Sequence, residues 1–384
     1  MGRFGDGIGV AGDLTQAADV AVKAALVPLH GRTPDLAFVF VSGGDPDEAG
    51  TAGQRAGALT GAATVLGCSA GGVIGGGRGV EGVGAVSVWV GELPGMRLRA
   101  FHLEVLRTEA RTSVVGLPER EGGDELDEVA VLLADPYSFP IDGFVARAAE
   151  TRPGLTLVGG IAHGPHGPGT TRLWVDGRIV DRGAVGLLLA GSGLRPLVSQ
   201  GCRPIGPAMT VTAAAGNRIT GLAGTPALDK LRQVLAALPP GDQALASAGL
   251  QLGIAADEYA EDQDYLVRGI LGAEGDALVV GDLVAVGQTV RLQVRDADAA
   301  DADLRATLVR HGVVPGGGAL LFSCNGRGAN LFGPTYGGAA HDETVVRQGL
   351  AADAVAGFFA DGELGPVAGK SHLHGFTASV LCFP

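Results

Sequence analysis

Glycine is the residue that most constrains how this chain can fold. The sequence holds 66 glycines among 384 residues, about two and a half times the usual share of about 7%. A glycine inside a helix or strand costs roughly 0.5–1 kcal/mol relative to alanine, whereas a folded domain is stable by only about 5–15 kcal/mol. Most of the excess must therefore lie in turns and loops, or where backbones approach each other or a ligand. No Gly-x-y period is present, which excludes a collagen triple helix.

The remaining composition is that of a packed, acidic protein. Hydrophobic residues make up 46% and charged residues 18%, so the bulk of the chain is not disordered. No apolar run reaches the 18–20 residues that a membrane helix needs, so no membrane partner is expected. The net charge of −13, with no stripe of Lys or Arg, argues against nucleic acid as a partner. Four scattered cysteines and a start without a signal-peptide pattern predict a cytoplasmic protein.

One pattern recurs three times along the chain. Each copy reads strand, helix, strand, glycine-containing loop and closing strand. The first strands span 36–41, 129–135 and 319–325, and the closing strands span 85–90, 184–190 and 375–383. Adjacent strands joined by short loops, with helices interspersed, predict an α/β (α+β) fold of mixed, largely antiparallel sheets with flanking helices. We expect a layered αββα sandwich built from these repeated units.

A different segment separates the second copy from the third. Thr225 and Pro226 predict the start of a helix, with Thr as N-cap and Pro at the first helical position. The run Pro-Pro-Gly at 239–241 predicts its end. A Gly/Ser/Pro stretch at 191–197 predicts a domain boundary, which divides the chain into residues 1–193 and 194–384.

Four stretches resemble a known family. LGCSAGGVIG at 66–75 resembles the signature of the FIST N-terminal domain. VSQGCRPIG at 198–206, LFSCNGRG at 321–328 and AGFFADGELGPV at 356–367, which runs on to LHGFTA at 373–378, resemble the FIST C-terminal domain. Their order along the chain matches that of the family, and together they cover nearly all of the sequence.

The resemblance implies a sensory function. FIST domains look like sensory modules that occur beside bacterial signalling domains and in some eukaryotic F-box proteins. They are thought to bind small ligands, with amino acids as one proposal, and certain relatives sense gases through haem, which makes haem a possible cofactor here. No kinase, methyl-acceptor or cyclase segment is present in the sequence. The output is therefore expected to pass to a separate signalling protein.

The loop Cys324-Asn325-Gly326-Arg327 is the first candidate for ligand contact. It follows an apolar strand, its glycines let backbone N–H groups approach an anion, and Arg327 can fork onto a carboxylate. The alternative is a strand end with a tight turn, in which Asn325 serves only the turn and Arg327 is solvated. The resemblance favours ligand contact.

The matching loop of the first copy is the second candidate. Cys68, Ser69, Gly71 and Gly72 could form another anion-binding concavity, or they could only allow close strand packing. The loop lacks the Gly-Lys-Ser/Thr of a phosphate-binding Walker motif. Glu363, in a third glycine loop, could hold an ammonium group or Arg327, or lie in a solvated turn.

Three more residues, His374, Lys370 and Arg203, complete the candidate set. His374, which lies in a family stretch, could contact the ligand or be a hydrogen-bonded structural residue. Lys370 could supply a second cation, and Arg203 could face the cleft or form a structural ion pair. His163 is expected in a surface loop, with metal or haem binding as the less favoured alternative.

The leading hypothesis is a cytoplasmic small-ligand sensor without catalytic activity. A zwitterionic ligand fits Arg327 for its carboxylate and Glu363 for its amine. A thiol enzyme is the main rival, with Cys324 as nucleophile, His374 as base and Asn325 or Asp361 as the orienting group. Two further hypotheses are a haem-based gas sensor and a protein-interaction scaffold that binds no ligand.

Overall fold

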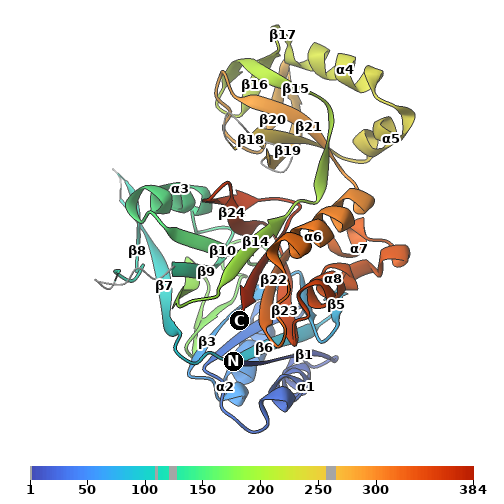
Figure 1. Ribbon diagram of the computed structural model, residues 1–384. Helices are drawn as coiled ribbons and strands as arrows, with labels where there is room; N and C mark the ends of the chain where they lie inside the picture. The colour runs from blue at the N-terminus through green and yellow to red at the C-terminus, as the bar shows by residue number, and fades with distance from the viewer. Residues whose placement is uncertain (1, 109–110, 121–127, 257–264) are drawn as a thin grey trace. The chain divides into compact units, whose positions relative to one another are not determined.

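The contacts of the chain divide it into two units. The computed structural model describes residues 2–108, 111–120, 128–256 and 265–384. Unit 1 comprises Met1–Ser199, Leu304–Leu373 and Ala378–Pro384, and unit 2 comprises Gln200–Asp303 and His374–Thr377 (Figure 1). Unit 2 is thus largely an insertion into unit 1. The division into a FIST N-terminal domain of residues 1–193 and a FIST C-terminal domain of residues 194–384 stays a prediction.

Unit 1 is built from the three repeats that the sequence predicts. In each repeat two parallel strands are joined by a helix, and a closing strand runs antiparallel to the first. The repeats are β2 (Leu36–Ser42), α2 (Pro46–Thr60), β3 (Thr64–Ala70) and β6 (Ala85–Glu92); β9 (Glu128–Ala134), α3 (Ile141–Thr151), β10 (Leu155–Ile161) and β13 (Ala184–Ala190); and β22 (Gly318–Cys324), α8 (His341–Leu350), β23 (Ala354–Ala360) and β26 (Ala378–Phe383). The order of elements expected in each copy is confirmed.

Each closing strand also pairs with a strand that precedes its repeat. These leading strands are β1 (Arg3–Val10), β7 (Arg97–Arg107) and β14 (Arg195–Ser199), and β8 (Thr112–Val115) extends the second sheet. The helix α1 (Leu14–Leu26) begins after Asp13, whose side chain accepts a hydrogen bond from the Thr15 amide. Glycines in β1 allow α1 to pack closely, because a Cβ on Gly9 would lie 1.9 Å from the Ala17 carbonyl oxygen.

The repeats interlock through exchanged hairpins. Each hairpin leaves its own repeat and extends the sheet of another: β4 (Gly72–Gly75) pairs with β23, β11 (Leu173–Val175) pairs with β3, and β24 (Glu363–Val367) pairs with β10. Their second strands are β5 (Arg78–Glu81), β12 (Arg178–Val180) and β25 (Lys370–His374). The exchange runs from the first repeat to the third, from the second to the first, and from the third to the second. Every sheet of unit 1 therefore contains strands of two repeats.

The core of unit 1 lies between facing sheets. Phe40 of β2 and Phe358 of β23 are fully buried, with ring centroids 5.1 Å apart, and Trp89 of β6 lies 4.9 Å from Phe383 of β26. Buried residues of α1 and α2 join the same core as the first sheet, and buried residues of α8 pack against β22 and β23. Helices thus flank packed mixed sheets, as expected for an α+β sandwich.

Unit 2 carries its own sheet and core. Its strands are β15 (Cys202–Ala215), β16 (Arg218–Leu222), β17 (Thr225–Pro226), β18 (Leu250–Ala255), β19 (Tyr265–Glu274), β20 (Ala277–Val280) and β21 (Thr289–Arg295), with the helices α4 (Ala227–Ala237) and α5 (Pro240–Ala248). A further helix, α6 (Ala297–His311), leads back into unit 1. None of the helices in the described residues is long and apolar enough to span a membrane.

The expected helix start at Thr225 is wrong. Thr225 pairs with Leu222, and Pro226 pairs with Gly221 in a short hairpin, so α4 begins only at Ala227. The reason is that an extended Thr-Pro pair suits a strand end as well as a helix start, and pairing with β16 decides between them. The Pro-Pro-Gly run also begins a second helix, α5, in addition to ending the first.

Candidate functional site

Three equivalent positions converge at the carboxyl ends of the parallel strands. In each repeat a glycine of the second strand lies opposite the middle of the first: Gly67 opposite Val39, Gly159 opposite Leu132, and Gly357 opposite Leu321. Four residues after these glycines come Gly71, His163 and Asp361. The His163 Nδ1 atom lies 2.9 Å from Asp361 Oδ2, and a Cβ on Gly71 would lie 3.7 Å from the His163 ring. All three repeats therefore contribute to one place in unit 1.

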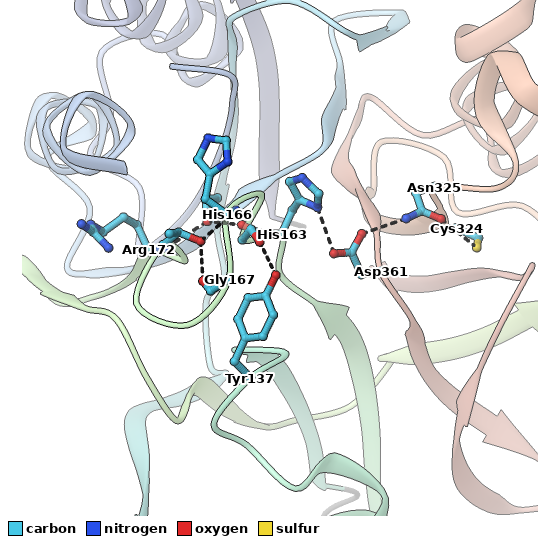
Figure 2. A network of polar contacts seen from close by, with 11 residues as sticks. Tyr137, His163, His166, Gly167, Arg172, Cys324, Asn325 and Asp361 are labelled. Atoms are coloured by element: carbon cyan, nitrogen blue, oxygen red, sulfur yellow. Dashed lines mark hydrogen bonds and ion pairs between the residues drawn. The ribbon is translucent and has the colours of Figure 1, made fainter. Parts of the chain in front are cut away.

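A chain of polar contacts runs from this place into the third repeat (Figure 2). Asn325 Nδ2 donates to Asp361 Oδ1 at 2.8 Å, so both carboxylate oxygens have a partner. The Cys324 thiol lies 3.7 Å from Asn325 Oδ1 and also accepts from the Gly326 amide at 3.4 Å. The hydrogen bond to Asp361 raises the pKa of His163, and burial offsets this only in part.

A cavity of about 400 Å³ opens beside His163. We call it the strand-end cavity because it lies at the carboxyl ends of β2 and β3, where α/β sheets commonly bind ligands. Residues from two repeats line it, among them Gly43, Gly44, Asp45, Ser69, Gly71, His163, His166 and Thr170. Gly71 leaves open the space that a side chain at this position would fill, since the atoms nearest to a Cβ there, those of the His163 ring, lie 3.7 Å away or farther.

The hydroxyl groups of the cavity are already engaged within the chain. Ser69 Oγ donates to the His163 carbonyl at 2.8 Å and accepts from the Arg172 amide at 3.0 Å. Thr170 Oγ1 donates to the Gly167 carbonyl at 2.7 Å. The Nε2 atom of His163 and the ring of His166 have no hydrogen-bond partner among the residues that the structure describes. These two imidazoles therefore have hydrogen-bonding capacity to spare.

A larger cavity of about 880 Å³ lies along α2 beside Trp174. Two of its polar side chains are engaged within the chain. Arg55 forms a bidentate ion pair with Asp19 at 2.7 and 2.8 Å, and Gln54 donates to the Gly177 carbonyl at 2.9 Å. Unlike the strand-end cavity, it is lined by residues that contact neither His163 nor Asp361 in the described contacts.

Arg327 holds a carboxylate of the chain itself. Its side chain is fully buried, and its Nε and Nη2 atoms donate to Asp342 at 2.7 and 2.8 Å. Ser323 and His341 also bond to Asp342. Although burial alone would raise the pKa of Asp342, the charge and hydrogen bonds of Arg327 hold it well below its usual range. The forked guanidinium expected from the sequence is present, within a buried ion pair at the start of α8.

The other predicted residues are dispersed. Glu363 is fully buried, and its charge is among the causes that raise the pKa of Arg327 against the effect of burial. Gly72 begins β4, and Lys370 is exposed on β25. Arg203 forms ion pairs with Asp242 and Asp296 at 2.6 Å within unit 2, and the buried His374 also belongs to unit 2.

Two cysteines differ in their surroundings. The Cys68 thiol is fully buried, and burial followed by the charge of Asp361 raises its pKa well above the usual value. Cys324 is 6% exposed and ends β22 beside the polar chain. The structure thus brings Ser69, Gly71, Asn325 and Cys324 into one neighbourhood, whereas Arg203 and His374 lie in the other unit.

Sequence reasoning missed His163 and gave Asp361 only a minor role. His163 was expected in a surface loop, yet its backbone amide donates to the Ser69 carbonyl at 3.0 Å and its ring holds Asp361. The signal that could have found both is the glycine of the second strand in each repeat. Counting four residues from that glycine reaches Gly71, His163 and Asp361 in turn.

Comparison with known proteins agrees with the resemblance in the sequence. The FIST N domain matches residues 35–225, and the FIST C domain matches residues 227–366. Uncharacterized protein Rv0628c of Mycobacterium tuberculosis strain H37Rv is 41% identical, with 99% of each chain covered. Uncharacterized protein Mb0898c of Mycobacterium bovis is 39% identical over 99% of this chain and 98% of its own. FIST domains are generally small-ligand sensory domains of signal transduction rather than enzymes. The chain belongs to the FIST family.

Proposed function

We propose that this protein is a small-ligand sensor whose ligand occupies the strand-end cavity. The observation that carries the proposal is a cavity of about 400 Å³ at the convergence of three repeats, next to an imidazole with an unused nitrogen. Known ligand pockets measure about 300–1,000 Å³ and combine a few placed polar groups with a preformed shape. A cavity at the lower end of this range suits a molecule of amino-acid size.

The polar chain supports a role in signalling. A ligand that contacts His163 also acts on Asp361, and through Asn325 it acts on the loop after β22. These residues come from the second and third repeats, while the cavity itself is lined mainly by the first. Occupancy of one cavity is thereby coupled to the packing of all three repeats. In this proposal, a change in that packing alters the protein surface, and a separate signalling protein recognises the altered surface.

Filling the cavity tests the proposal. Replacing Gly71 by Leu adds a side chain where a Cβ has only ordinary contacts of 3.7 Å and longer, so the variant should fold normally. The matched control is Gly143→Leu, in α3, where a Cβ meets nothing within 4 Å. Binding is measured by thermal shift and isothermal titration calorimetry against the twenty standard amino acids.

We expect wild type and Gly143→Leu to bind the same amino acid, and Gly71→Leu to bind it at least tenfold more weakly. A ligand that binds Gly71→Leu as tightly as wild type would place the site elsewhere. If no amino acid binds, and no small molecule is carried through a gentle purification, the protein is an interaction scaffold instead.

A further inference from the structure

We infer that the ligand presents an anionic group, a carboxylate or a similar oxyanion, to Nε2 of His163, and that its binding is coupled to protonation of this ring. The inference rests on the proposed function, because it concerns the same cavity. It replaces Arg327 with His163 as the group that recognises the negative charge of the ligand.

The contacts of His163 decide which ring nitrogen carries a proton. Asp361 Oδ2 lies 2.9 Å from His163 Nδ1, and Asp361 Oδ1 accepts from Asn325 at 2.8 Å. An ionised carboxylate only accepts hydrogen bonds, so Nδ1 must be the donor. The second ring nitrogen, Nε2, has no partner among the described residues, and His163 lines the cavity, so we assign Nε2 to the ligand. The amide of Asn325 holds Asp361 in place, so the orientation of the His163 ring is fixed before a ligand arrives.

The charge of the His163 ring depends on its neighbours. The hydrogen bond to Asp361 raises the pKa of His163, and the side chain is 36% exposed. The ring therefore keeps its second proton to a higher pH than a free imidazole does, and in this protonated form Nε2 donates a hydrogen bond. An anion at Nε2 stabilises the protonated form further, so binding takes up a proton. Above the raised pKa the neutral ring offers only an acceptor at Nε2, and affinity for an anion falls.

Other groups near His163 affect the charge of the cavity. Among the residues that line the cavity in the described part of the chain, no Lys or Arg occurs. Asp45 is occupied as the N-cap of α2, where it accepts from the Asp47 and Glu48 amides at 2.9 Å. The Cys68 thiol stays neutral because burial raises its pKa. His166 also lines the cavity, but His163 is the imidazole whose ring Asp361 orients, so we assign the anion to His163.

The experiment follows the ring by NMR and binding by calorimetry. The pKa of His163 is measured from its ring Cε1–H signal, assigned with His163→Gln, in the absence and presence of acetate, L-aspartate or inorganic phosphate. Acetamide is the neutral control for acetate. We expect each anion that binds to raise the pKa of His163, and its affinity to fall at least tenfold between pH 6 and pH 8.5. Acetamide should leave the signal unchanged.

Variants separate this inference from the proposed function. We expect His163→Gln to bind the anion at least tenfold more weakly and to lose the pH dependence, whereas His166→Gln keeps it. One result would overturn the inference and leave the proposed function standing. In this result Gly71→Leu blocks anion binding, but the binding is equally tight in His163→Gln or is independent of pH. The absence of any ligand, or a ligand that Gly71→Leu does not affect, would overturn the proposed function as well.

Discussion

Gly71, His163 and Asp361 show how one backbone position acquires three roles. The position is the same in every repeat, yet glycine leaves a space, histidine faces that space, and aspartate orients the histidine. A small pocket results because the side chains at the convergence of the repeats are unequal. Three identical large side chains would fill the same place.

The buried ion pair of Arg327 and Asp342 should contribute strongly to stability. Removing one partner of a buried pair leaves an uncompensated charge and costs roughly 3–5 kcal/mol. We therefore expect Asp342→Asn to lower the free energy of unfolding by about this amount in urea titrations. The control is Glu150→Gln, which breaks an exposed pair with Arg147 and should cost less than about 1 kcal/mol. Equal effects of the two substitutions would contradict this account.

The same pair gives a dependence on pH. Because Arg327 lowers the pKa of Asp342 in the folded state, the stabilisation is present above the ordinary Asp pKa of about 4 and is lost as the pH falls below it. Asp342→Asn lacks this titration. The difference in unfolding free energy between wild type and Asp342→Asn should therefore shrink between pH 7 and pH 3. A constant difference over that range would mean that Asp342 does not carry the effect.

The sequence predicted several residues of the candidate site, but it did not predict which residues they contact. It singled out Cys324, Asn325, Ser69 and Gly71, which do lie in one neighbourhood. The partner of Arg327 was missed because residue types alone do not distinguish a carboxylate of the chain from that of a ligand. The contact between His163 and Asp361 joins residues 198 apart in sequence, which no local pattern reveals.

At the scale of elements, glycine serves the parallel strand pairs. A Cβ on Gly67 would lie 1.8 Å from the Val39 carbonyl oxygen, and one on Gly357 would lie 1.7 Å from that of Leu321. The two parallel strands are therefore so close at this position that no Cβ fits there. Gly67 and Gly357 therefore have a structural role. This agrees with the expectation that part of the glycine excess lies where backbones approach each other.

Substitution of these glycines should destabilise the protein. We expect Gly67→Ala and Gly357→Ala each to cost at least roughly 1–3 kcal/mol, the usual range for overpacking, because backbone atoms must move. Gly71→Ala is the comparison within the same strand region and should be nearly neutral, since its Cβ has only ordinary contacts. Melting temperatures of the three variants test this. A melting temperature of Gly67→Ala equal to that of Gly71→Ala would contradict the close approach.

The elements within each repeat were predictable, whereas the exchange between repeats was not. Long apolar strands such as β2 and β22 stand out by composition, and Asp13 marks the start of α1. The exchanged strands are as short as three residues, as in β11, and a short strand specifies no partner by pattern alone. Thr225 likewise has a favourable helix signal that hairpin pairing overrides.

At the scale of the whole molecule, unit 2 is a long insertion that begins and ends at neighbouring points. The Gln200 amide donates to Asp303 Oδ2 at 2.8 Å, so the two ends of the insertion meet. Unit 2 has its own core, which includes Val211, Leu252 and Leu292. Unit 1, in turn, contains the strand-end cavity and every residue of the polar chain.

Unit 1 should therefore fold without the insertion. We expect a variant in which a short Gly/Ser linker replaces residues 200–303 to unfold cooperatively and to keep the affinity of the strand-end cavity for its ligand. Circular dichroism melting and calorimetry provide the measurements. A cooperative fold that has lost the ligand would assign recognition to unit 2, and an unfolded product would show that unit 1 depends on it.

Native mass spectrometry of gently purified protein tests the central claim most directly. Wild type and Gly143→Leu should each carry an additional small mass that is released on denaturation, and Gly71→Leu, prepared in parallel, should not. The same additional mass on Gly71→Leu, or none on wild type, would contradict a ligand in the strand-end cavity.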